Sequence, residues 1–162
     1  MTIIVKPFKR HKELKKTLLS LIDELPKNSE KTIHNTDWNL SKEYEKKYLN
    51  LFYLNINEHM MSLCKEFNCD KWFIDNGWFQ QYKNCDEHGW HNHPKCQFSN
   101  VYYLELPDKN MTTEFYDGQE IEASEGDILT FPSYLIHRSK PNLTNKRKTI
   151  IAFNSSLMHG NN

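Results

Sequence analysis

Three histidines lie close together in the segment HGWHNHP, which spans residues 88–94. Residues i and i+2 of an extended strand face the same side, so His91 and His93 can direct both imidazoles at one point. Two converging imidazoles are what a transition-metal ion requires from a pair of protein ligands. An isolated pair of this kind is more often exposed or hydrogen-bonded, so a metal site needs further evidence.

A third histidine and a run of basic residues supply that evidence. His137 lies 46 residues after His91 and directly follows the strand-like segment DILTFPSYLI, where a strand end can return it to the first pair. The segment KRK at 146–148 begins another strand ten residues later and places a cation nearby. Three imidazoles and a cation suit a divalent metal with an anionic, chelating ligand. Their spacing does not distinguish iron from zinc, copper or nickel.

The elements that must position these residues begin with helices. Leucine and isoleucine recur at three- and four-residue steps over residues 14–25, which predicts a helix that ends at Pro26. The polar residues 27–40 predict a loop. A second, longer helix is expected to begin near Ser41, a suitable N-cap, and to continue to Phe67.

The rest of the chain has the pattern of short strands. The extended segments are TIIV (2–5), expected at a sheet edge, KWFIDNGWFQQY (71–82), CQFSNVYYLELP (96–107), TTEFYDGQEIEASEGDILTFP (112–132) and KRKTIIAFNSSL (146–157). The Asn-Gly pair at 76–77 is typical of a turn. Helices followed by strands indicate one α+β domain, with a helical part over about 8–68 and an antiparallel barrel or sandwich over about 71–157.

Composition and motif content argue against several classes of function. Lysine plus arginine and aspartate plus glutamate both number 21, so the formal net charge is zero, which argues against a nucleic-acid partner. No stretch approaches the roughly 18 apolar residues of a membrane span. The four cysteines form no CxxC pair, and a cytoplasmic location with reduced thiols is expected. Motifs of serine hydrolases, P-loop NTPases and dinucleotide-binding proteins are absent from the sequence.

The motifs of the second half resemble the 2-oxoglutarate/Fe(II)-dependent oxygenases, and in particular a branch found in marine phage and bacterial genomes. The matching motifs are WHNHP (90–94), SNVYYL (99–104), FPSYLIH (131–137), PN (141–142), KRK (146–148) and AFN (152–154). The resemblance implies a double-stranded β-helix, that is, a cupin-like jelly-roll, with Fe(II) at its open end. It also implies a dioxygenase that couples oxidative decarboxylation of 2-oxoglutarate to hydroxylation of a C–H bond.

The resemblance further implies which residues form the site. His91, His93 and His137 would hold the iron, although most relatives carry an aspartate where this chain has His93. Family members anchor 2-oxoglutarate with a basic residue on the strand after the last histidine. Arg147 is the preferred candidate, and Lys148, which faces the other way on a strand, is the alternative.

Further residues are candidates for lining the site, with ordinary packing as the alternative for each. Tyrosines are expected beside the co-substrate, namely Tyr82 and Tyr103. The candidates for the substrate pocket are Trp78, Gln80, Trp90, Arg138 and Asn154. His34 and His88 have no partner at metal-ligand spacing and are expected to be structural or surface residues.

Two other functions compete with the oxygenase hypothesis. One is a cupin-like three-histidine metalloprotein that does not use 2-oxoglutarate, such as a thiol dioxygenase or an isomerase. The other is a catalytically inactive jelly-roll module that binds sugar or peptide. The sequence leaves the substrate open between a small molecule and a protein side chain, and it does not define the oligomeric state.

Overall fold

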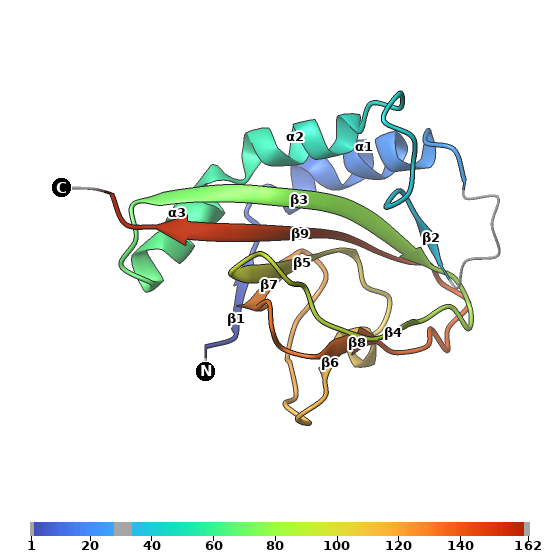
Figure 1. The fold of residues 1–162 in the computed structure, drawn as a ribbon. Coiled ribbons are helices and arrows are strands. Elements are labelled where there is room, and N and C mark those ends of the chain that lie inside the picture. The colour runs from blue at the N-terminus through green and yellow to red at the C-terminus, as the bar shows by residue number, and fades with distance from the viewer. Residues whose placement is uncertain (1, 28–33, 161–162) are drawn as a thin grey trace.

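The computed structural model describes residues 2–27 and 34–160, in which two antiparallel sheets face each other (Figure 1). The larger sheet has the strand order β1-β7-β5-β9-β3-β2, and the smaller one has the order β4-β8-β6. The strands of the two sheets are β1 (Ile4–Pro7), β2 (Asn35–Thr36), β3 (Lys71–Tyr82), β4 (His88–His91), β5 (Phe98–Glu105), β6 (Thr113–Phe115), β7 (Asp127–Pro132), β8 (His137–Ser139) and β9 (Lys148–Met158). An edge strand was predicted at TIIV (2–5), and β1 does lie at the edge of the larger sheet, but it spans Ile4–Pro7 and overlaps the segment only at residues 4 and 5.

The three α-helices of the described residues precede most of these strands and lie on the side of the larger sheet away from the smaller one (Figure 1). They are α1 (His11–Asp23), α2 (Lys47–Asn55) and α3 (Asn57–Glu66), and a short 3-10 helix spans Lys109–Met111. Helix α1 buries Leu14, Leu18 and Ile22, which share one face of the helix. No helix in the described ranges is long and apolar enough to cross a membrane.

The predicted long helix from Ser41 to Phe67 is wrong in two respects. The helix begins only at Lys47, and it is interrupted at Ile56, which separates α2 from α3. Asparagine is a poor helix former, and the Asn55 side chain donates a hydrogen bond to the Leu51 carbonyl oxygen at 2.8 Å. This local bond competes with continuation of the helix, while the buried Ile56 keeps both segments packed on the sheet.

The predicted turn at Asn76–Gly77 is also wrong, because β3 continues through it from Lys71 to Tyr82. The pairing of β3 with β9 shifts register between Ile74 and Asn76, so the pair marks an irregularity in a long strand. Gly77 is required here by close approach: a Cβ atom at this position would lie 2.1 Å from the Tyr53 hydroxyl oxygen.

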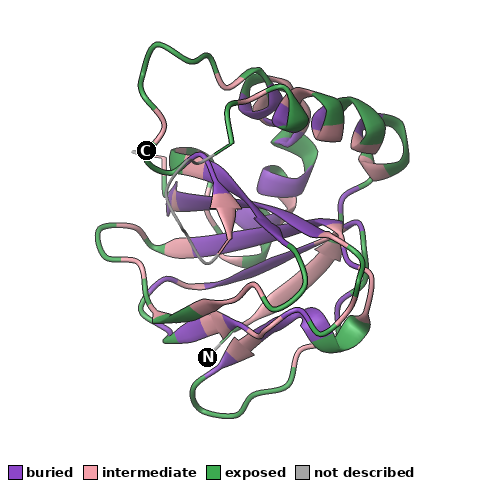
Figure 2. Cartoon of the chain, turned by 90° about the vertical axis from the view of Figure 1, so that its right-hand side faces the viewer, coloured by how far each residue is buried: buried purple, intermediate pink, exposed green. Residues whose placement is uncertain are grey.

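Alternation along the central strand β9 divides the interior into two parts. Ile151 and Phe153 face the helices, where they pack in one hydrophobic core. Ile150 and Ala152 face the smaller sheet, where they join a second core. Figure 2 shows buried residues along the strands and exposed ones on the outer sides of the helices. The space between the two sheets is where the three predicted metal ligands lie.

Candidate metal centre

The three histidines converge at the ends of two paired strands. His91 ends β4 and pairs with His137, the first residue of β8. His93 follows two residues after His91, and its backbone N–H donates to the Ser133 carbonyl oxygen at 3.0 Å. One ligand nitrogen from each histidine lies within 4.8 Å of the other two. The structure therefore brings together the side chains that the spacing predicted would meet.

Hydrogen bonds fix the orientation of two of these rings. His91 Nδ1 donates to the Gly89 carbonyl oxygen at 2.8 Å, and His137 Nδ1 donates to the Leu135 carbonyl oxygen at 2.9 Å. A proton on Nδ1 leaves the Nε2 lone pair available to a metal. The ring of His93 packs against Trp78 instead, with centroids 5.5 Å apart.

The environment keeps these imidazoles neutral, which is the form that binds metals. Burial lowers the pKa of His93 to about 4 and the pKa of His137 to about 3. Burial also lowers the pKa of His91 below its ordinary value. Little proton competition therefore opposes metal binding near neutral pH.

The triad opens into a cavity between the sheets that has no acidic side chain among its described lining residues. Its polar wall includes Gln80, Tyr82, Ser139 and Lys148, and its apolar floor includes Ile150. A metal ion held by three neutral imidazoles in such a cavity keeps its full charge. The cavity is therefore suited to an anionic ligand.

Lys148 strengthens this preference because it places a cation inside the same cavity. Only 1% of the residue is exposed, its Nζ donates to Ser139 Oγ at 2.8 Å, and it lies 5.0 Å from the centre of the Tyr82 ring. No ion pair joins it to a carboxylate within residues 2–27 and 34–160. Burial lowers the pKa of Lys148 to about 7. A buried ammonium without a counterion destabilises the fold, and an anionic ligand would supply one.

Arg147, the preferred anchor from the sequence, lies elsewhere. Its guanidinium donates to Glu105 at 2.8 Å and to Asp23 at 2.9 Å, at the end of helix α1. It is not among the residues that line the cavity. Two carboxylates already neutralise this side chain, so of the two candidates the structure brings only Lys148 to the histidines.

The two predicted tyrosines differ in position. Tyr82 lines the cavity, and its hydroxyl donates to Gln80 Oε1 at 2.8 Å. Tyr103 is fully buried in the core between the sheets, where its hydroxyl lies 3.0 Å from Thr113 Oγ1. Tyr103 does not line the cavity. It is a core aromatic residue whose hydroxyl contacts β6.

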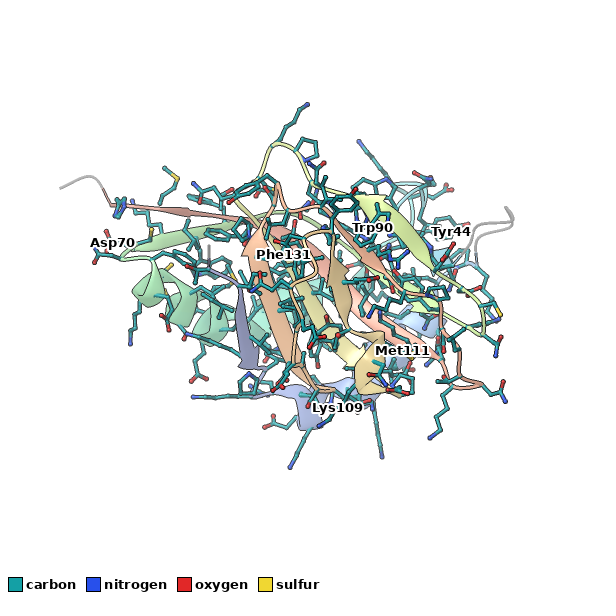
Figure 3. The ribbon with its side chains drawn as sticks, turned by 90° about the horizontal axis from the view of Figure 1, so that it is seen from below. Tyr44, Asp70, Trp90, Lys109, Met111 and Phe131 are labelled. Carbon is teal, nitrogen blue, oxygen red and sulfur yellow. The ribbon has the colours of Figure 1, made fainter. Side chains whose placement is uncertain are left out.

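The candidates for the substrate pocket also divide. Trp78, Gln80 and Asn154 line the cavity. Trp90 does not: it is 41% exposed and contacts Tyr116 and the Arg138 guanidinium. Arg138 lines the cavity, yet its guanidinium pairs with Glu114 and lies over Trp90. Figure 3, seen from the side of the smaller sheet, labels Trp90 on β4 and Phe131 on β7.

His88 was expected to be a structural or surface residue, but it lines the cavity. Its ring stacks on His91 with centroids 4.1 Å apart. The two histidines are three positions apart in the chain, so strict alternation places them on opposite faces of a strand. The register of β4 against β8 shifts between them, and this irregularity turns both rings inward. No signal in the sequence marks the shift.

Sequence comparisons do not identify the chain: no protein-family model matches it, and a search of curated proteins finds no match. Solved structures do match, and they show that the chain has the fold of 2-oxoglutarate/Fe(II) oxygenases. The viral collagen prolyl hydroxylase of Paramecium bursaria Chlorella virus 1, in complex with 2-oxoglutarate, is 15% identical with a TM-score of 0.64 and 96% coverage of each chain.

Two bacterial structures are similar in the same way. An oxidoreductase of the 2OG-Fe(II) oxygenase family from Burkholderia pseudomallei is 15% identical with a TM-score of 0.72, covering 95% of this chain and 84% of that one. HygX from Streptomyces hygroscopicus, with nickel and 2-oxoglutarate bound, is 9% identical with a TM-score of 0.69. The match covers 95% of this chain and 82% of HygX. At these identities the likeness concerns the fold, and the function must be argued from the site.

Proposed function

We propose that this protein is an Fe(II)- and 2-oxoglutarate-dependent dioxygenase, a hydroxylase with a jelly-roll (double-stranded β-helix) core. The observation that carries the proposal is the position of Lys148. A buried ammonium without a carboxylate partner shares a cavity with three converging imidazoles. A chelating dianion such as 2-oxoglutarate would offset the charge of a metal ion on the imidazoles and the charge of the Lys148 ammonium at the same time.

The donor set fits Fe(II). His91, His93 and His137 would hold the ion through neutral imidazole nitrogens, two of them oriented by backbone carbonyls. Three protein ligands would leave coordination positions free for other ligands. When bound, the iron supplies the oxidising chemistry in which the co-substrate is decarboxylated to succinate. The protein's own residues bind and orient the reactants and exclude water.

The charges of the site favour a dianionic co-substrate. A divalent ion with three neutral ligands keeps two positive charges, and protonated Lys148 adds a third. The distal carboxylate would lie against Lys148, whose ammonium Ser139 holds by a hydrogen bond at 2.8 Å. The phenol ring of Tyr82 packs beside the same ammonium. Lys148 is therefore the anchor we propose, in place of Arg147.

The substrate would enter at the other end of the same strand. Lys148, Ile150, Ala152 and Asn154 follow one another along the inner face of β9, which places Asn154 roughly 20 Å from Lys148 at the usual rise per residue. Trp78 lines the cavity beside His93 and is paired with Ala152. These residues would contact a small molecule or a peptide side chain. The prolyl hydroxylase and HygX, the latter also with hygromycin B bound, illustrate this range of ligands.

The three-histidine donor set favours a second candidate, a cupin-like metalloprotein that does not use 2-oxoglutarate. Imidazole in place of a carboxylate leaves more charge on the metal, which suits other anionic substrates equally well. In that case Lys148 would bind the substrate rather than a co-substrate. The two functions differ in whether 2-oxoglutarate itself binds.

Calorimetric titration of the Ni(II)-loaded protein with 2-oxoglutarate tests the proposal, because nickel is the ion present in the HygX complex. We expect binding in the wild type and a loss of at least about 30-fold in Lys148→Met, the effect of truncating one partner of a buried charge pair. Arg147→Met is the matched control and should retain affinity. Metal-dependent binding of other anions but not of 2-oxoglutarate would favour the cupin-like alternative.

A further inference from the structure

His88 lines the same cavity as the metal ligands and Lys148. Its ring stacks on His91 at 4.1 Å. The backbone of His88 pairs in the sheet with Ser139, the residue whose hydroxyl accepts from Lys148 Nζ. A co-substrate held at one end by the metal and at the other by Lys148 would therefore extend past this imidazole.

A hydrogen-bond network that reaches His88 through Gln80 fixes the orientation of the His88 ring. The Tyr82 hydroxyl donates to Gln80 Oε1 at 2.8 Å. The other terminal atom of the Gln80 amide, Nε2, is therefore the NH₂ group, which can only donate. Gln80 Nε2 in turn donates to His88 Nδ1 at 2.8 Å and to His34 Nε2 at 3.2 Å. His34 Nδ1 donates to the Glu87 carbonyl oxygen at 3.2 Å. Every member of the network thus has a defined direction of donation.

This direction determines the tautomer of His88. Because Nδ1 accepts from an amide that can only donate, the ring proton must be on Nε2. A ring that accepts at Nδ1 is neutral and carries its single proton on Nε2. Gln80 therefore orients an N–H donor in the wall of the cavity that also holds the Lys148 ammonium.

We propose that His88 is a co-substrate-binding residue whose Nε2–H donates a hydrogen bond to a carboxylate oxygen of 2-oxoglutarate, and that Gln80 fixes it in the donor tautomer. The inference rests on the proposed function. It assigns a role to a residue outside the three ligands and the lysine anchor. Gln80 acts through His88 as a positioning residue, in place of the substrate contact expected for it from the sequence.

Two variants separate the donor from a purely packing role. His88→Phe keeps a ring to stack on His91 but has no N–H group. His88→Gln loses the ring but keeps an amide N–H near the position of Nε2. Each would be loaded with Ni(II) and titrated with 2-oxoglutarate, and Ni(II) affinity would be measured separately. Thermal unfolding verifies that each variant is folded, and Gln80→Met provides a further test that leaves His88 itself intact.

We expect His88→Phe to bind 2-oxoglutarate about 10- to 100-fold more weakly with Ni(II) affinity unchanged, as for loss of a hydrogen bond to a charged group. His88→Gln should recover part of this loss, and Gln80→Met should show a smaller loss. Wild-type affinity in His88→Phe would overturn the inference, as would a parallel loss of nickel and 2-oxoglutarate affinity or a His88→Gln variant no better than His88→Phe. Failure of the wild type to bind 2-oxoglutarate would instead overturn the proposed function.

Discussion

Arg147 and Lys148 are consecutive in the chain, yet their side chains lie on opposite sides of the larger sheet. Arg147 pairs with Glu105 and Asp23 beside helix α1, whereas Lys148 enters the cavity that the three histidines share. Strand alternation therefore gives two adjacent basic residues different functions. One stabilises the contact between helix and sheet, and the other is available to an anion.

The isolation of Lys148 predicts how stability depends on pH. Its pKa is lowered to about 7 in the folded protein, whereas an unfolded chain keeps the ordinary value near 10.4. Between these values the unfolded state binds more protons, so the free energy of unfolding should rise with pH. Below pH 7 the whole penalty of the buried charge is present. Lys148→Met should then be more stable than the metal-free wild type.

Urea unfolding of the metal-free proteins at pH 6 and pH 9 measures this difference. The stabilisation by Lys148→Met should be largest at pH 6 and should decrease as the pH rises through the window from 7 to 10.4. Lys146→Met, which changes an exposed lysine two residues earlier, is the control and should show no such trend. A pH-independent effect of Lys148→Met would show that the lysine is not buried as an isolated charge.

The position of His93 predicts the effect of replacing it by aspartate, the residue that the family resemblance leads one to expect there. His93→Asp should bind Ni(II) at least as tightly as the wild type, because an anionic ligand offsets the charge of the ion. His93→Ala should lose more than the 10- to 100-fold that removal of an outer hydrogen-bond partner causes. Competition with a chromogenic chelator measures the Ni(II) affinity of both variants. Equal affinities of the aspartate and alanine variants would exclude His93 as a ligand.

Metal binding should also stabilise the fold. A ligand at 100 times its Kd contributes about 2.7 kcal/mol, which for a chain of this size corresponds to a rise in Tm of roughly 5–11 °C. Scanning calorimetry with Ni(II) should show this rise in the wild type and in His159→Ala, whose imidazole is exposed and is not among the residues that line the cavity. His137→Ala should show no rise, and the same shift in that variant would contradict the assigned site.

The close approach at Gly77 predicts a coupled pair of substitutions. Gly77→Ala should lower the free energy of unfolding by about 1–3 kcal/mol, because the added Cβ overlaps the Tyr53 hydroxyl. Tyr53→Phe loses no hydrogen bond, since this hydroxyl is buried and has no partner among the described residues. The double variant should therefore recover much of the loss. Gly89→Ala, with no atom within 4 Å of its added Cβ, is the control.

Much of the site could be predicted from spacing alone. The i, i+2 relationship of His91 and His93, together with a strand end at His137, was enough to predict that the three imidazoles converge. The same alternation showed that Arg147 and Lys148 exclude each other as anchors. It did not show which of them faces inward, because that depends on the register of β9 against β3, where Lys148 pairs with Tyr82.

The residues that sequence reasoning missed depend on irregular structure. His88 reaches the cavity through the register shift in β4, and His34 reaches Gln80 from a segment 46 residues away in the chain. Similarly, the Asn-Gly pair that is typical of a turn lies inside β3, because close packing against Tyr53 requires a glycine there. Local propensity does not contain these tertiary requirements.

The most direct test of the central claim is succinate formation from 2-oxoglutarate by the Fe(II)-loaded protein in the presence of oxygen, measured without a prime substrate. The proposal predicts slow, iron-dependent succinate release by the wild type. His91→Ala and Lys148→Met should abolish this release, and Arg147→Met should retain it. Iron-loaded wild type that releases no succinate, or equal release by the Lys148→Met variant, would contradict the proposal.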